Sequence, residues 1–165
     1  MQRADKTAGR HRDRHLNGIF ALADGSLLIT AEAGTLFRST DRGRTWTKEA
    51  VPYSGSLWGG LALRGGGALV FGMRGHVLRR TGEGGWTDVP TGTDRSITGG
   101  IERADGTVIL VGLSGAFLRS SDGGRSYEAS VRPERQTLTG VAEGVPGKLV
   151  LIGMPGVVKD IAQQK

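Results

Sequence analysis

Five arginines, one tyrosine and one histidine stand in stretches that read as loops, where their side chains could bind a partner instead of filling a core. Arginine is the side chain best suited to bidentate contact with a carboxylate or a polypeptide terminus. The candidates are Arg14, Tyr53, Arg74, His76, Arg95, Arg132 and Arg135. Their types predict binding of an acidic or extended peptide, if the fold brings them to one face.

Metal and thiolate chemistry have little support in the sequence. The chain has no cysteine, which rules out a disulfide framework and a thiolate metal site. His11, His15 and His76 are too widely separated to suggest a metal site, and loop or edge roles are expected for them. The sequence therefore predicts neither a metal nor another cofactor.

A repeated octet organises the elements that must position these residues. The octet STDRGRTW at residues 39–46 returns as SSDGGRSY at 120–127, and residues 80–86 are a shortened copy that keeps the glycines and the terminal aromatic. In such a hairpin loop, Ser and Asp side chains accept bonds from backbone N–H groups, glycine takes positive φ, and the aromatic anchors the next strand. A structural role is therefore predicted for Ser39, Asp41, Gly43, Trp46, Trp86, Ser120, Asp122, Gly124 and Tyr127.

Aligning the octets divides the chain into a basic segment, residues 1–15, and four units at 16–56, 57–96, 97–137 and 138–165, the last incomplete. The spacing of about 40 residues is that of a propeller blade. In each unit the sequence predicts a short strand, a glycine turn and a continuous apolar strand. The apolar strands are expected at residues 27–30, 69–72, 108–112 and 149–153. A third strand follows, and the first three units add a fourth. The predicted fold is all-β, a β-propeller or partial propeller arc of about four four-stranded blades.

Together with the octets, the segments LFRS at residues 36–39 and GMRGHV at 72–77 resemble sequences of the photosystem II stability/assembly factor family. Its Asp-box repeats also occur in sialidases and sortilin-like receptors. The resemblance covers nearly the whole chain and implies a β-propeller without catalytic activity that binds a polypeptide, such as a membrane-protein assembly client. In that family an Arg-rich face is thought to meet the client, and Arg74 is the first position to carry this role over.

Antiparallel blades place successive connections on alternate faces, so the turns between second and third strands share a face with the crossovers between units. The residues expected there are Glu32, Arg74, His76 and Ser114 from the turns, Tyr53, Asp94, Arg95, Arg132, Glu134 and Arg135 from the crossovers, and Arg12, Arg14 and Trp58 at the first unit's edge. This face has more arginine than acid. Arg38, Arg79 and Arg119 recur once per unit before the octet, which favours a scaffold role.

Two other functions stay open on the sequence. One is a sialidase-like glycosyl hydrolase or carbohydrate-binding propeller, for which Tyr53 with Glu32 is the sole conceivable nucleophile pair, since Tyr127 belongs to an octet. The other is a truncated fragment without independent function, because family members usually have seven blades. We expect no enzymatic activity.

Composition narrows the partners further. The formal charge of +6 suggests acidic partners, but the arginines are scattered and no stacking aromatics alternate with them, so nucleic acid is not predicted. No apolar run is long enough to insert into a membrane. The N-terminus lacks the apolar region of a signal peptide. The chain as written predicts a cytoplasmic location, or a periplasmic or extracytoplasmic one if the N-terminus is truncated.

Closure of the propeller is a further question. Residues 5–9 stand in the place of an outer strand, which would either complete the last unit and close a small ring or belong to a neighbouring, preceding blade that the chain lacks. They have no aromatic anchor and little to bury. We therefore expect an open arc, whose uncovered apolar faces and strand edges favour self-association.

Overall fold

The computed structural model describes residues 14–82, 84–154 and 156–158. Four antiparallel sheets follow one another along the chain, and within each sheet the strands pair in sequence order. The first two sheets are β1 (Leu16–Ala21), β2 (Leu27–Ala31), β3 (Leu36–Ser39) and β4 (Thr47–Glu49), then β5 (Leu57–Ala62), β6 (Ala68–Gly72), β7 (Val77–Arg80) and β8 (Trp86–Val89). The other two are β9 (Ile97–Glu102), β10 (Val108–Gly112), β11 (Ala116–Ser120) and β12 (Glu128–Val131), then β13 (Leu138–Glu143), β14 (Leu149–Gly153) and β15 (Gly156–Val158).

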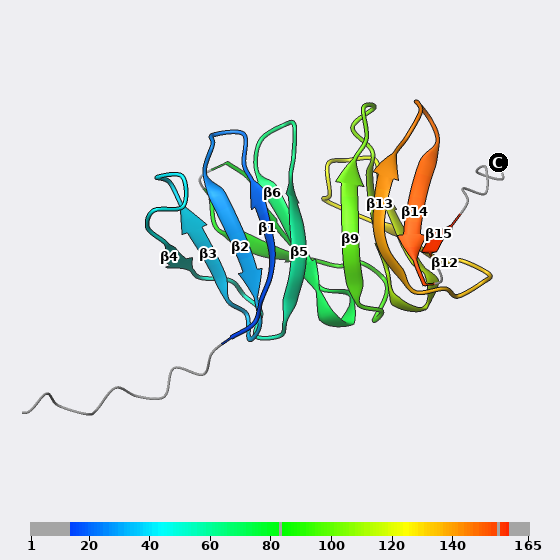
Figure 1. Ribbon diagram of the computed structural model, residues 1–165, viewed down its shortest axis with the longest axis horizontal. Helices are drawn as coiled ribbons and strands as arrows, with labels where there is room; N and C mark the ends of the chain where they lie inside the picture. Colours follow the sequence, from blue (N-terminus) through cyan, green and yellow to red (C-terminus); the bar gives the residue numbers. More distant parts are fainter. Residues whose placement is uncertain (1–13, 83, 155, 159–165) are drawn as a thin grey trace, which may run out of the picture.

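The sheets are the blades of a four-bladed β-propeller, which confirms the predicted fold class. The first strands β1, β5, β9 and β13 lie in this order, with β1 and β13 at the two ends of the row (Figure 1). No helix in the described part of the chain is long and apolar enough to cross a membrane.

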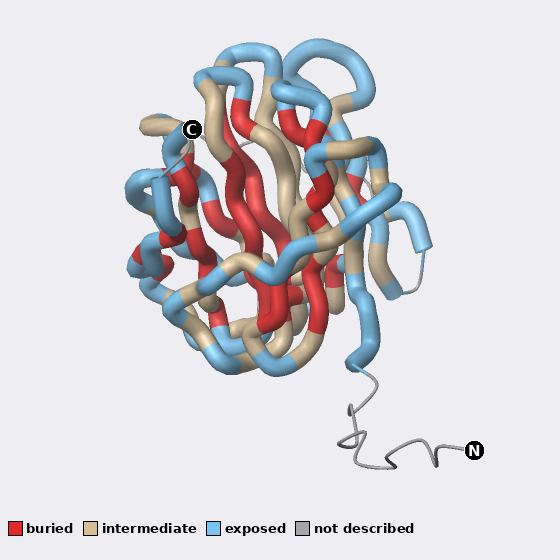
Figure 2. Tube along the Cα trace, turned by 90° about the vertical axis from the view of Figure 1, so that its left-hand side faces the viewer, coloured by how far each residue is buried: buried red, intermediate tan, exposed pale blue. Residues whose placement is uncertain are grey.

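Apolar second strands form the core between blades. Every residue of β6 and β10 is buried, because each strand has another blade on both sides. Figure 2 shows buried segments running through the middle of the molecule. Three apolar clusters fill the spaces between successive blades, with Leu28 against Val70, Leu69 against Leu110, and Ile109 against Leu151 as representative members.

Glycines let the first strands approach one another closely. A Cβ at Gly60 would lie 2.4 Å from the ring of Phe20 in the preceding blade and 2.6 Å from the carbonyl oxygen of Leu69. A Cβ at Gly99 would lie 3.0 Å from the Cα of Gly140 in the next blade. The glycine pairs noted in the sequence therefore stand where blades converge.

The turns between second and third strands share one backbone conformation. In the first three blades a non-glycine residue and the glycine after it both have positive φ, as at Arg74 (56°) and Gly75 (74°). Two successive left-handed residues are typical of a type I′ hairpin turn. Hydrogen bonds tie these turns to the loops between blades, as from the backbone N of Gly34 to the carbonyl of Gly55 (2.7 Å). We call the surface made by these turns and loops the crossover face.

The octets close hairpins at the opposite end of the blades. The Asp41 carboxylate accepts bonds from the hydroxyl (2.6 Å) and the backbone N (2.9 Å) of Thr45. Asp122 makes the same two contacts with Ser126. Strand β4 begins at Thr47 and β12 at Glu128, so in these two blades the aromatic stands one residue before the strand. In the second blade Trp86 is itself the first residue of β8.

The shortened octet relies on contacts between blades. The indole N–H of Trp86 donates to Glu49 Oε2 at 2.8 Å, and the Arg80 guanidinium lies 5.3 Å from the centre of the Trp86 ring. Arg80 also forms an ion pair of 2.9 Å with Glu49. These contacts join the first blade to the second.

Two of the arginines that recur before each octet contact neighbouring backbone or charges. The guanidinium of Arg38 lies 2.7 Å from the Asp24 carboxylate, and Arg79 Nε donates to the carbonyl of Gly123 in the third blade's octet at 2.9 Å. These contacts fit the scaffold role that the sequence suggested for both residues.

Candidate functional groove

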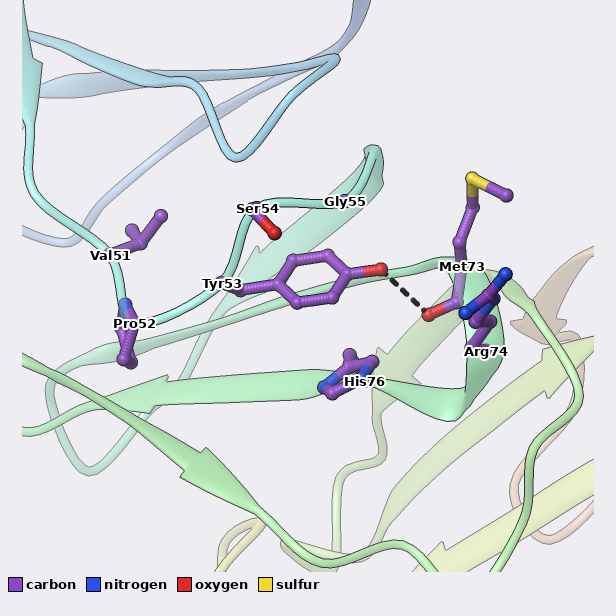
Figure 3. Close-up of a pocket in the computed structure, with 8 residues that line it drawn as sticks. All are labelled: Val51, Pro52, Tyr53, Ser54, Gly55, Met73, Arg74 and His76. Atoms are coloured by element: carbon purple, nitrogen blue, oxygen red, sulfur yellow. Dashed lines mark hydrogen bonds between the residues drawn. The ribbon is translucent and has the colours of Figure 1, made fainter.

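An open groove of about 760 Å³ lies on the crossover face between the first and second blades. One wall is the crossover loop between β4 and β5, and the other is the 3-10 turn η1 (Met73–Gly75) with the residue after it. Figure 3 shows the lining side chains, which are Val51, Pro52, Tyr53, Ser54, Gly55, Met73, Arg74 and His76.

Tyr53 spans the groove from one wall to the other. Its hydroxyl donates a 3.1 Å hydrogen bond to the carbonyl of Met73 (Figure 3). Its ring packs on His76 with 4.2 Å between centroids and 32° between planes. Partial burial raises the pKa of Tyr53, so the phenol stays protonated and keeps donating at neutral pH. Tyr53 thus fixes the loop against the turn.

His76 is held from its far side by the fourth strand of the same blade. Its Nδ1 lies 3.3 Å from Asp88 Oδ2, a contact that becomes an ion pair when the imidazole is protonated. The ring therefore has a carboxylate at one edge and the phenol ring of Tyr53 at 4.2 Å. Together Tyr53 and His76 make a rigid aromatic floor.

Arg74 stands at the tip of the turn, where its backbone is left-handed. Its backbone N donates to Ser96 Oγ at 3.2 Å, which ties the tip to the next crossover loop. The guanidinium has no hydrogen bond or ion pair with any described residue, and the side chain is exposed. Figure 3 shows this side chain beside Met73 at the same end of the groove that the Tyr53 hydroxyl reaches. An unpaired cation at a groove edge is suited to bind an anionic group.

The groove brings together three of the residues predicted to bind a partner: Tyr53, Arg74 and His76. The other four belong to the same face but do not line it. Arg95 belongs to the next crossover loop, beside the Ser96 that holds Arg74, and Arg14 Nη1 donates to Thr35 Oγ1 at 2.6 Å.

The remaining two arginines stand in the crossover loop between β12 and β13. Arg132 is mostly buried, and its Nε lies 3.7 Å from Glu134 Oε2, whereas Arg135 is exposed with φ of 50°. Partner binding by these seven residues stays a prediction, and Arg12 lies outside the described residues.

Several residues of the groove were not predicted from the sequence. Met73, Val51 and Pro52 supply apolar lining, and Asp88 supplies the carboxylate beside His76. Met73 could have been found from its place beside Arg74. Asp88 carries no such signal, because only the pairing of β7 with β8 brings it close.

The conceivable nucleophile pair of a sialidase-like site gains no support from its contacts. The Tyr53 hydroxyl bonds to Met73, while the Glu32 carboxylate lies 3.3 Å from His15 Nδ1. Among the described residues, no group of three or more His, Cys, Asp or Glu side chains is arranged to hold a metal ion.

Comparison with known proteins shows likeness at the level of the fold. No family model matches the sequence, and a search of curated proteins finds no match either. The structure is similar to that of YCF48 bound to D1 peptide, with 19% identity, a TM-score of 0.64, and coverage of 87% of this chain and 48% of that one.

Two lyase structures are also similar to this chain. A catalytically inactive virginiamycin B lyase from Staphylococcus aureus with quinupristin shares 17% identity (TM-score 0.71; 86% of this chain, 50% of that one). A streptogramin B lyase shares 16% identity (TM-score 0.67; 87% and 53%). The chain thus spans about half the length of these propellers. The likeness to YCF48 confirms the predicted resemblance at the level of the propeller fold, and the lyases show that similar propellers include enzymes.

Proposed function

We propose that this chain is a non-catalytic peptide-binding module whose groove on the crossover face takes an extended, acidic stretch of polypeptide. The observation that carries the proposal is the unpaired, exposed guanidinium of Arg74 beside the packed rings of Tyr53 and His76. The guanidinium makes a bidentate contact with a carboxylate of the peptide. The aromatic floor packs against the neighbouring side chain, in the manner of grooves that read extended peptides.

Comparison of the blades supports a binding role for these side chains. Where the second blade has Arg74 and His76, the first has Ala33 and Thr35 and the third has Ser114 and Ala116. The same turn therefore forms without a cation or an aromatic ring. The fold alone does not require Arg74 or His76, so a separate reason for them is expected.

Tyr53 differs from its counterparts in the same way. The corresponding residues of the next two crossover loops, counted back from β9 and β13, are Thr93 and Glu134. A large aromatic at this position is peculiar to the first loop, where it forms the floor of the groove.

The similar YCF48 structure adds support for a polypeptide partner, because it contains a bound D1 peptide. The octet carboxylates support the proposal that the chain is non-catalytic, because Asp41 and Asp122 accept hydrogen bonds from residues of their own turns. The client that fits this chemistry exposes a flexible acidic segment or a C-terminal carboxylate, as a membrane-protein assembly client with a polar tail would.

The test is a peptide-binding titration with matched charge reversals. Fluorescently labelled extended peptides, one acidic and one basic with the same apolar residues, are titrated with the protein, and anisotropy reports binding. We expect the acidic peptide to bind more tightly and Arg74→Glu to weaken it about tenfold, which corresponds to about 1.4 kcal/mol. The matched control is Arg44→Glu, an exposed arginine in the first octet on the opposite face.

Two results would contradict the proposal. One is equal weakening by Arg74→Glu and Arg44→Glu, which would mean that only net charge matters. The other is an unchanged peptide affinity in the double variant that combines Tyr53→Ala with Arg74→Glu, which would place the peptide elsewhere.

A further inference from the structure

The outward face of the fourth blade is apolar and uncovered, although its counterparts in the other blades are buried. In strand register, Val150 and Ile152 correspond to Leu69 and Phe71 of the second blade and to Ile109 and Val111 of the third. The four counterparts are at most 2% exposed, whereas Val150 is 40% and Ile152 47% exposed. We call Val150, Ile152 and their β15 neighbour Val157 the leading face, because the equivalent residues elsewhere pack on the following blade.

The first blade presents the opposite half of the same interface. Leu16 corresponds to Leu57, Ile97 and Leu138, each of which is fully buried, yet Leu16 is 61% exposed. Ile19 and Ile29 lie beside it and line a shallow depression with Gly18. We call Leu16, Ile19 and Ile29 the trailing face, because their counterparts pack on the preceding blade.

The groups that form the innermost hydrogen bond between blades are present on the two end faces. In the third blade, Thr98 Oγ1 donates to the carbonyl of Leu138 in the next blade at 2.6 Å. Thr139 is the counterpart of Thr98 in the fourth blade, and within the described part of the chain its hydroxyl bonds only in its own blade, at 3.4 Å from the carbonyl of Ile152. The counterpart of the Leu138 carbonyl is that of Leu16. The fourth blade therefore has the donor, and the first blade the acceptor, of a junction that is not made among the described residues.

Glycines at the centre fit the same junction. Gly18 approaches Gly59, and Gly99 approaches Gly140, so that a Cβ on either first partner would lie 3.0 to 3.3 Å from the Cα of the second. Gly140 and Gly18 are the two members of this series that face outward at the ends of the row. A Cβ at Gly140 would lie 3.1 Å from Cγ1 of Ile152, so the Ile152 side chain lies beside this glycine and belongs to the surface that a further blade would meet.

Charge is also compatible with this junction. Between the third and fourth blades, Arg103 pairs with Glu143 at 2.9 Å, and between the second and third the backbone N of Arg64 bonds to Glu102. In register, the position of Glu102 and Glu143 is occupied in the first blade by Ala21. At this position the first blade therefore brings no carboxylate into the junction.

From these observations we infer that a second copy of this chain docks its trailing face on the leading face of the first, so that two copies close head to tail. Each copy contributes one face to each of two equivalent junctions, and such heterologous contacts end when the rotation closes a ring. The two junctions repeat the blade-to-blade packing that already occurs three times within the chain. Two copies also match the length of the similar solved propellers, of which one copy spans about half.

Sedimentation velocity and light scattering on the full chain, over a wide range of concentration, test the inference. The expected result is a discrete species of twice the chain mass. Ile152→Asp and Ile19→Asp should each shift it to the mass of one chain, because each substitution places a carboxylate in both junctions. Val131→Asp is the matched control, since Val131 is also partly exposed but belongs to β12, away from both end faces.

A mixing experiment distinguishes head-to-tail contact from other dimers. An equimolar mixture of the Ile19→Asp and Ile152→Asp chains retains one unaltered junction, so dimers should reappear in the mixture. A dimer made by two leading faces would instead survive Ile19→Asp alone and overturn the inference. Circular dichroism checks that the variants fold, and Ile19→Thr and Ile152→Thr replace any that do not. A wild-type monomer at every concentration, an open-ended series of larger species, or a dimer unaffected by both substitutions would each overturn it as well.

Discussion

The hydroxyl of Ser126 donates a 2.6 Å hydrogen bond to Asp122 Oδ2, while the backbone N of Ser126 donates to Oδ1 at 3.0 Å. Both oxygens of one carboxylate are therefore used to close the third blade's octet. Ser120 Oγ adds a contact of 2.7 Å to the same carboxylate. This arrangement leaves Asp122 as a turn-forming residue with little freedom to act on a ligand.

Replacing Asp122 by alanine should lower the free energy of unfolding by about 1 to 2 kcal/mol, the scale of losing side-chain bonds to a turn. Urea denaturation measures the change. Asp94→Ala is the control, because the exposed Asp94 carboxylate makes no hydrogen bond or ion pair with a described residue, and it should be neutral. Peptide binding should survive in both variants. Full stability with lost binding in Asp122→Ala would show that the structural assignment is wrong.

Acid should destabilise the protein through the octets. The hydroxyl and backbone N–H of Thr45 lower the pKa of Asp41 from 3.8 to about 2, and the Ser126 hydroxyl is the main cause of a lowered pKa at Asp122. Because each pKa is lower in the folded state, the stabilisation is complete above the unfolded value and is lost as pH falls through the folded value. We expect the urea concentration at the midpoint of unfolding to decrease as the pH is lowered from about 4 towards 2.

Asparagine substitution supplies the control for this acid effect. Asp41→Asn with Asp122→Asn removes both titrating groups, so the variant should lose less stability than the wild type between the same two pH values. An equally steep fall in the variant would assign the acid sensitivity to other carboxylates, such as Glu143, whose pKa is lowered chiefly by the backbone N–H of Gly147.

Close packing of the first strands predicts a strong effect of side chains at their glycines. Gly99→Val should destabilise by about 1 to 3 kcal/mol, because its Cβ would meet backbone of the fourth blade and cannot be relieved by rotating a side chain. Gly65→Ala is the matched control, since a Cβ there meets nothing within 4 Å. Thermal unfolding compares the two. Equal melting temperatures would contradict the account of blade packing.

Salt dependence should report the role of the crossover face in binding. Charged groups at the rim of an interface act mainly on the association rate and are screened by salt. Arg74→Glu with Arg135→Glu should therefore slow association with an acidic peptide and flatten its dependence on ionic strength, as measured by stopped-flow fluorescence. Unchanged kinetics in this double variant would remove the crossover face from consideration.

Much of the fold could be predicted from the sequence because its signals are local and repeated. Continuous apolar runs gave the second strands within a residue or two, as at β10 (Val108–Gly112) and β14 (Leu149–Gly153). The paired glycines predicted the close approach of the first strands, and the alternation of connections between the two ends of the blades predicted the crossover face. Residues 5–9, considered as a closing strand, lie outside the described residues.

The groove could be predicted only in part. Tyr53, Arg74 and His76 were each assigned to the right face, but their mutual geometry depends on contacts over long sequence separations. Tyr53 reaches the Met73 carbonyl across 20 residues, and His76 reaches Asp88 across the paired strands β7 and β8. Loop conformations of this kind are set by tertiary contacts and leave no periodic signal in the sequence.

The most direct test of peptide binding in this groove is a nuclear magnetic resonance titration of the labelled protein with an extended acidic peptide. The account predicts that shifts concentrate at the backbone amides of Tyr53, Arg74 and His76, and that they disappear in Arg74→Glu but persist in Arg44→Glu. Shifts confined to the octet hairpins around Asp41 and Asp122, or no shifts with any acidic peptide, would contradict it.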